Sequence, residues 1–188
     1  MVGKFIVLEG VDGAGIKTQS SLLAKHLIGK GVKVYSTKEP TGGILGGLSK
    51  AVLNGEWSLS DRAHHLDSEI EPALANGKVV ISDRYMFSTL AYGFASKINY
   101  KWLRAINLSF RKPDLGILVD IKPTTSISRT SGVPESLQLF DKIEKIQKTR
   151  QMYLHIAKEF HLKVVDGEGT IEKVGEKINS IVDKFLRK

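Results

Sequence analysis

Short apolar runs alternate along the chain with longer segments in which apolar residues recur at helical spacing. The runs carry apolar residues at consecutive positions, as strands covered on both faces do. Five of them are predicted to be strands: Phe5–Glu9, Val32–Thr37, Lys78–Ser82, Leu115–Asp120 and Lys163–Asp166. Helical spacing, with glycines and capping residues at the ends, predicts the segments between them to be helices. These are Lys17–Lys30, a short one at Leu48–Leu53, one from Ser60 or Asp61 to Asn76, Phe87–Ala95, Tyr100–Phe110, Gln138–Phe160 and Ile171–Phe185.

This alternation of strands and helices predicts an α/β fold in three layers. A five-stranded parallel sheet would lie between two layers of helices, with right-handed connections. The chain has 188 residues, which suits one domain over 1–188. No repeat, low-complexity segment or linker divides it.

Composition excludes several classes of protein. No apolar run approaches the ~20 residues of a membrane span. The chain has no cysteine, so disulfides and thiolate zinc sites are excluded. Its first residues have no features of a signal peptide, and we therefore expect a cytoplasmic protein with no membrane partner.

The net charge of +8 suits anionic ligands, among them nucleotides. A solubilising surface explains such a charge equally well. The lysines are spread along the chain rather than gathered in a basic block, so we expect no nucleic-acid partner. A nucleic-acid-binding protein is nevertheless a weaker alternative.

The stretch FIVLEGVDGAGIKTQ, from Phe5 to Gln19, joins the first strand to the first helix through a glycine-rich loop. Phosphate-binding loops have glycine, four residues, glycine, lysine, and then serine or threonine. Here Gly10 and Gly15 have that spacing, but Ile16 stands at the lysine position. A glycine-rich turn without a ligand is the alternative, whereas a dinucleotide-binding turn needs a different glycine order. The stretch therefore predicts a phosphate site with an altered lysine.

Two other loops follow predicted strands and should lie at the same ligand-binding edge of the sheet. SDRY, after the third strand, places Asp83 and Arg84 where phosphates and Mg²⁺ would lie. TKEPTGG, after the second strand, places Lys38 there. An ordinary ion pair at a helix start and a loop of turn-forming residues are the respective alternatives.

Several helical residues are candidates for contacts with an anion or a base. Arg150 and Tyr153 are three residues apart and share a helix face, and Arg62 lies in DRAHH. They are equally compatible with ordinary helix-surface positions. His64 and His65 are adjacent and lack metal-ligand spacing, so no metal is expected from them.

Taken together, these segments resemble the thymidylate kinases, a family of P-loop nucleoside-monophosphate kinases. The resemblance covers nearly the whole chain and rests on FIVLEGVDGAG, KVYSTKEPTGG, LVDIKP with the following arginine, and KTRQMYLHIA. Its longest match is DRAHHLDSEIEPALANGKVVISDRYMFSTLAYG. It implies a P-loop NTPase-type fold, Mg-ATP-dependent phosphorylation of dTMP to dTDP, and a homodimer.

The resemblance also implies roles for individual residues. Asp12 would contact the sugar hydroxyl, Arg84 and Lys38 the acceptor phosphate, and Arg62 the base. Tyr92, Arg150 and Tyr153 would belong to the acceptor pocket. Thr18 and Asp83 would lie at Mg²⁺, and a lid at about 129–137 would close over ATP. Catalytic charge would come from Lys17, Lys38, Arg84 and Arg129. The loop contacts to ATP would come from Gly10, Val11, Asp12, Gly13, Ala14, Gly15, Ile16, Lys17 and Thr18.

The sequence departs from the family pattern at several places. Ile16 and Lys17 stand where the family has lysine and a hydroxyl residue, and one helical step rotates a side chain by about 100°. Lys38 replaces an arginine and loses its planar fork. Ser58 replaces a base-stacking phenylalanine, Gly93 replaces a polar residue, and the lid has few arginines.

Two further hypotheses stay open on these grounds. One is a nucleotide-binding relative with little or no catalysis, which the displaced lysine favours. The other is a kinase with relaxed base preference or a different nucleoside monophosphate as acceptor.

Overall fold

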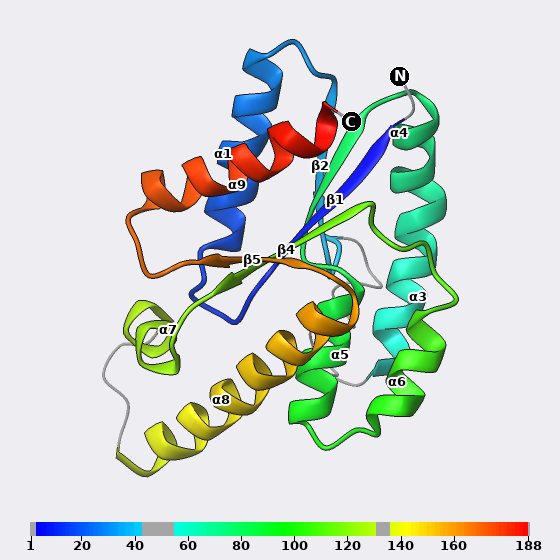
Figure 1. Cartoon of the computed structure of the whole chain (residues 1–188). Helices are drawn as coiled ribbons and strands as arrows, with labels where there is room; N and C mark the ends of the chain where they lie inside the picture. The colour runs from blue at the N-terminus through cyan, green and yellow to red at the C-terminus, as the bar shows by residue number, and fades with distance from the viewer. Residues whose placement is uncertain (1–2, 43–54, 131–135, 188) are drawn as a thin grey trace.

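The sheet has five parallel strands and runs through the whole molecule (Figure 1). The computed structural model describes residues 3–42, 55–130 and 136–187. Within these, the strand order is β2-β3-β1-β4-β5. The strands are β1 (Lys4–Glu9), β2 (Val34–Lys38), β3 (Val79–Asp83), β4 (Leu115–Asp120) and β5 (Lys163–Asp166). The predicted parallel sheet is confirmed.

Helices cover both faces of this sheet, as expected for three layers. On one face α1 (Ile16–Gly29) packs against α9 (Ile171–Leu186) (Figure 1). On the other face lie α5 (Met86–Ala95), α6 (Tyr100–Asn107) and α8 (Ser136–Glu159). The three inner strands are almost completely buried, whereas β2 and β5 are partly exposed because they form the two edges.

One predicted helix begins earlier than its sequence indicates. Helix α3 spans Gly55–His65 and continues through a π-helical turn, Leu66–Ile70, into α4, Glu71–Ala75. The predicted start at Ser60 or Asp61 is therefore wrong. The Asp61 carboxylate accepts hydrogen bonds from the backbone N–H and the hydroxyl of Thr41, so it ties a loop to the helix and does not cap it.

One helix was not predicted at all. Helix α7 spans Pro123–Thr130, directly after β4. Its sequence, PTTSISRT, has a single apolar residue, Ile127, and therefore no hydrophobic period. Proline is favourable in a first helical turn, and the buried Ser126 hydroxyl donates to the backbone oxygen of Asp12 at 2.6 Å. Tertiary contact with the loop after β1 therefore accounts for a helix that periodicity cannot show.

Other predictions differ little or lie outside the described residues. Helix α6 ends at Asn107 rather than Phe110. The predicted short helix at Leu48–Leu53 lies outside the described residues, as does the middle of the predicted lid, residues 131–135. In the described part of the chain, no helix is long and apolar enough to cross a membrane.

Candidate active site

The loop after β1 has the backbone of a phosphate-binding turn. Gly13 and Gly15 have φ angles of 79° and 81°, a region that glycine adopts at little cost. At Gly10 a side chain is excluded, because a Cβ there would lie 2.7 Å from the backbone oxygen of Val119. Gly15 directly precedes the first residue of α1, so the N–H groups at the start of the helix lie at the end of the loop, where an anion binds favourably.

The two residues that depart from the motif have different environments. Helix α1 begins at Ile16, directly after Gly15. The spacing from loop to helix is therefore not shifted, and Lys17 stays one position after the place where the motif has its lysine. The Ile16 side chain is 5% exposed, and its Cδ1 lies 3.0 Å from where a Cβ of Gly10 would be. Ile16 is thus packed against the beginning of the loop, and Lys17, the next residue, is exposed.

Lys17, Lys38 and Asp83 line one cavity, of about 490 Å³, between α1 and the end of β2. Burial raises the pKa of the Asp83 carboxyl, and the positive charges of Arg84, Lys38 and Lys17 oppose that rise. The structure therefore brings two of the predicted cations and the predicted metal-site carboxylate into one place.

A second cavity, of about 360 Å³, lies on the other side of the loop. Gly13, Gly15 and Thr18 line it together with Arg129. The Arg129 guanidinium donates to the backbone oxygens of Gly13, at 3.2 Å, and Gly167, at 3.4 Å. Thr18 and Asp83, the two predicted metal ligands, thus line different cavities.

Arg84 is the centre of a third group of predicted residues. It has a φ of 70°, and its guanidinium donates to the backbone oxygen of Gly10 at 2.9 Å and to Asp12 Oδ1 at 2.8 Å. The guanidinium also donates to the Tyr153 hydroxyl at 3.3 Å and lies 5.3 Å from the ring centre of Tyr92. Burial by itself would lower the Arg84 pKa, but Tyr153, Tyr92 and Asp12 raise it above its usual range.

Beneath Arg84 lies a buried carboxylate that the sequence analysis did not single out. Glu9, the last residue of β1, accepts hydrogen bonds from the Ser88 hydroxyl at 2.6 Å and from the Tyr153 hydroxyl at 3.0 Å. Its other oxygen accepts from the backbone N–H of Tyr85 at 2.8 Å. Burial raises the pKa of Glu9 to about 7, although these hydrogen bonds and Arg84 oppose the rise. The available signal was a charged residue at the end of the apolar run KFIVLE.

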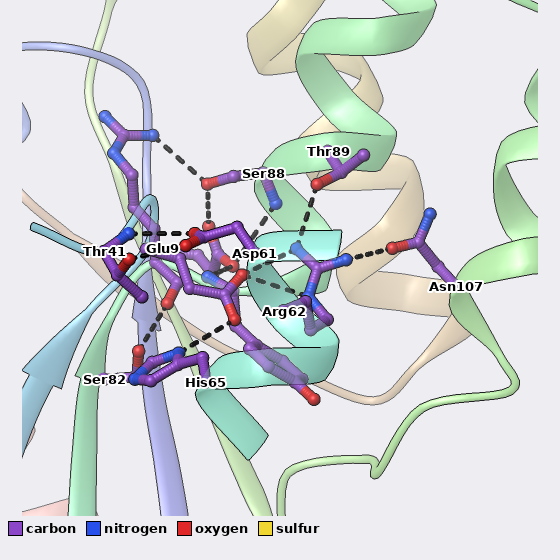
Figure 2. Close-up of polar contacts among 12 residues, drawn as sticks. Glu9, Thr41, Asp61, Arg62, His65, Ser82, Ser88, Thr89 and Asn107 are labelled. Atoms are coloured by element: carbon purple, nitrogen blue, oxygen red, sulfur yellow. Dashed lines mark hydrogen bonds and ion pairs between the residues drawn. The ribbon is translucent and has the colours of Figure 1, made fainter. Parts of the chain in front are cut away.

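Arg62 is buried among protein partners. It is 1% exposed, and its guanidinium donates to Glu39 Oε2 at 3.0 and 2.7 Å. It also donates to Asn107 and to the Thr89 hydroxyl (Figure 2). His65, also fully buried, lies 3.1 Å from the other Glu39 oxygen. Arg62 therefore anchors the segment after β2 to α3, α5 and α6.

Two other candidates lie outside the Arg84 group. Arg150 forms a two-pronged ion pair with Asp120 at the end of β4, at 2.7 and 2.8 Å. Gly93 lies where α5 packs on α6, because a Cβ there would be 2.6 Å from Leu103 Cδ1. Ser58 falls in α3, but its side chain lies outside the described part of the structure.

A parallel sheet in this strand order, with a glycine-rich loop leading from β1 into α1, defines a P-loop NTPase-type α/β protein. The thymidylate kinase family pattern matches residues 8–178. The chain is 38% identical to a probable thymidylate kinase of Thermococcus gammatolerans, and the alignment covers 98% of each chain. It is 39% identical to one of Pyrococcus horikoshii, over 99% of this chain and 98% of the relative. This chain belongs to the thymidylate kinase family.

Proposed function

We propose that this protein transfers the terminal phosphoryl group of Mg-ATP to dTMP, giving dTDP and ADP. The observation that carries the proposal is the group of Asp12, Arg84, Tyr92 and Tyr153 directly beside the phosphate loop. The names of the family and of its relatives support thymidylate as the acceptor.

On the donor side, the loop backbone would hold the phosphates of ATP. The N–H groups at the start of α1 suit an anion, and Thr18 and Arg129 line the cavity beside them. Arg129 already contacts the loop through the backbone oxygen of Gly13. Release from the backbone oxygens of Gly13 and Gly167 would free the guanidinium for a phosphate oxygen.

On the acceptor side, Arg84 and Asp12 would hold the nucleotide. The Asp12 side chain is 64% exposed, so its carboxylate is accessible to a sugar hydroxyl. One terminal nitrogen of the Arg84 guanidinium is held by backbone and hydroxyl contacts, and a phosphate oxygen would compete with Asp12 for the other. Lys38, across the cavity that Asp83 also lines, would add a second positive charge. Phosphoryl transfer needs chiefly such positioning and positive charge.

Mg²⁺ would enter as part of the Mg-ATP substrate. Asp83 is the carboxylate beside the loop, and Thr18 lies across the loop from it. In the described part of the chain, no group of three His, Cys, Asp or Glu side chains could hold a metal ion. In the transfer step the protein would therefore meet the metal mainly through Asp83 and the water molecules around it.

Arg62 and Arg150 would act through other residues. The Arg62 side chain contacts Glu39, Asn107 and Thr89, so we propose that it shapes the base pocket from behind. Arg150 would fix α8 against β4 through Asp120 and thereby hold Tyr153, one helical turn away, beside Arg84. A single domain, a lid near 129–137, a homodimer and a cytoplasmic location remain predictions.

The proposal is tested by measuring ADP release from Mg-ATP with dTMP, dUMP, dCMP, dGMP and UMP as acceptors. We expect turnover with dTMP above the other four. Turnover with a different preferred acceptor would contradict only the base assignment. Measurable ATP binding with no turnover on any acceptor would contradict the kinase and leave a nucleotide-binding relative.

A further inference from the structure

The phosphate loop keeps its register but has a lysine at the position of its hydroxyl residue. In the usual motif the lysine that follows the second glycine reaches the outer phosphates, and the next residue contributes a hydroxyl to Mg²⁺. Here α1 begins at Ile16, so Ile16 occupies the first of these positions and Lys17 the second. A packed isoleucine supplies neither charge nor a hydrogen bond to a phosphate.

Lys17 has its charge on the side of the loop where a metal ion would lie. It lines the same cavity as Asp83, and its charge acts on that carboxyl. Thr18, the next residue of α1, lines the cavity on the opposite side. The hydroxyl residues that line the cavity of Lys17 lie further along α1, in β2 and in the loop after it. Lys17 is exposed and lines this cavity, so its ammonium is accessible to a ligand.

The chemistry of an ammonium group differs from that of the hydroxyl it replaces. It has three donors and no lone pair, so it cannot coordinate a metal ion. It is, however, a compact positive charge that can donate to phosphate oxygens and to a carboxylate at the same time. A divalent cation beside Asp83 would also be repelled by this ammonium at close range.

We propose that the Lys17 ammonium takes the place of the divalent cation between Asp83 and the ATP phosphates, so that ATP binding depends only weakly on metal. This inference rests on the proposed function for its choice of ligand. It concerns the binding step alone, and phosphoryl transfer is not part of it.

The test is ATP affinity, measured by calorimetry once in EDTA and once in excess Mg²⁺. For the native chain we expect the two dissociation constants to agree within about threefold, because a lysine–phosphate contact needs no metal. The Lys17→Ser variant regains a hydroxyl at this position and loses the positive charge of the lysine ammonium. We expect its affinity in EDTA to fall about tenfold or more, as for a lost charge-assisted hydrogen bond, and to recover with Mg²⁺.

Two further variants sharpen the comparison. Ile16→Lys combined with Lys17→Ser restores the usual order, and its ATP affinity should rise at least about tenfold on adding Mg²⁺, because the hydroxyl can again bind the metal. Lys25→Ser removes another lysine that lines the same cavity and should leave both dissociation constants unchanged. Circular dichroism checks that each variant is folded. The comparison of the native chain in EDTA and in Mg²⁺ decides by itself whether ATP binding depends on metal.

The outcomes separate this inference from the proposed function. A native chain whose ATP affinity rises tenfold or more with Mg²⁺ overturns the inference, even if it phosphorylates dTMP. A chain that binds ATP in EDTA but does not phosphorylate dTMP supports the inference and contradicts the proposed function. Absence of ATP binding in both conditions overturns both.

Discussion

At the scale of single residues, the buried charges decide how the acceptor side of the site is held. Glu39 is almost fully buried and is held by Arg62 on one oxygen and His65 on the other. Arg62 also lies 4.8 Å from the ring centre of Tyr85. A charge without a partner in such surroundings is strongly unfavourable, so Arg62 and Glu39 depend on each other.

Replacing Arg62 with methionine should therefore destabilise the fold. The buried Glu39 carboxylate would lose its principal partner, which costs about 3–5 kcal/mol in comparable cases. Urea unfolding of the variant and the native chain measures the difference. The control is Arg111→Met, whose ion pair with Glu71 is well exposed and should contribute at most about 1 kcal/mol. An Arg62 variant as stable as the Arg111 variant would contradict this account.

A second prediction concerns Glu9 and pH. Its pKa of about 7 in the folded chain lies above its ordinary value of 4.5, so between these values the folded state holds a proton that the unfolded state has released. Its contribution to stability is therefore complete below pH 4.5 and is lost as the pH rises to about 7. The neighbouring charged or titratable groups are Arg84 and Tyr153, and both keep their protons in this range.

In Glu9→Gln this pH dependence should disappear. We expect the native chain to lose roughly 3 kcal/mol relative to the variant between pH 4.5 and pH 7.5, from 1.36 kcal/mol per pKa unit. Urea unfolding of both proteins across this range measures the difference between them. Parallel curves would show that Glu9 has no raised pKa.

At the scale of helices and strands, the sequence predicts elements whose apolar residues face the core. It does not predict elements that depend on contacts with residues far away in the sequence. The bounds of β4 and β5 follow directly from their apolar runs. Helix α7 was missed because its stabilising contact is Ser126 on the backbone of Asp12, 114 positions away. Similarly, the sequence indicates Arg84 through its position after a strand, but the buried Arg62–Glu39 pair depends on how three helices meet.

The contact between α5 and α6 gives a prediction at this scale. Alanine at Gly93 would place a methyl group 2.6 Å from Leu103, which is fully buried. Alanine favours a helix by up to about 1 kcal/mol over glycine, but overpacking costs about 1–3 kcal/mol, so we expect net destabilisation. Thermal unfolding measures it.

Gly29→Ala is the matched control, because beyond the neighbouring residues and the backbone of α1 itself no atom lies within 4 Å of the added methyl group. This control should be unchanged or slightly more stable. If Gly93→Ala is equally stable, α5 and α6 are not closely packed at this position.

At the scale of the whole molecule, the parallel sheet brings distant segments to one edge. Asp12 follows β1, Lys38 ends β2, and Arg84 follows β3, so three loops meet where the strands end. The charge of +8 is partly explained by this gathering, since Lys17, Lys38 and Arg84 face one region beside the loop. Such a concentration of positive charge suits the phosphates of two nucleotides.

The most direct test of the account is transfer of labelled phosphate from [γ-³²P]ATP to dTMP, followed as labelled dTDP. The native chain should form dTDP despite its displaced lysine. Arg84→Met should lose about a hundredfold or more of kcat/KM, as expected when a key donor to transferring phosphate is removed. Formation of labelled dTDP that depends on Arg84 is the predicted result. No labelled dTDP from the native chain, or equal rates with Arg84→Met, would contradict the account.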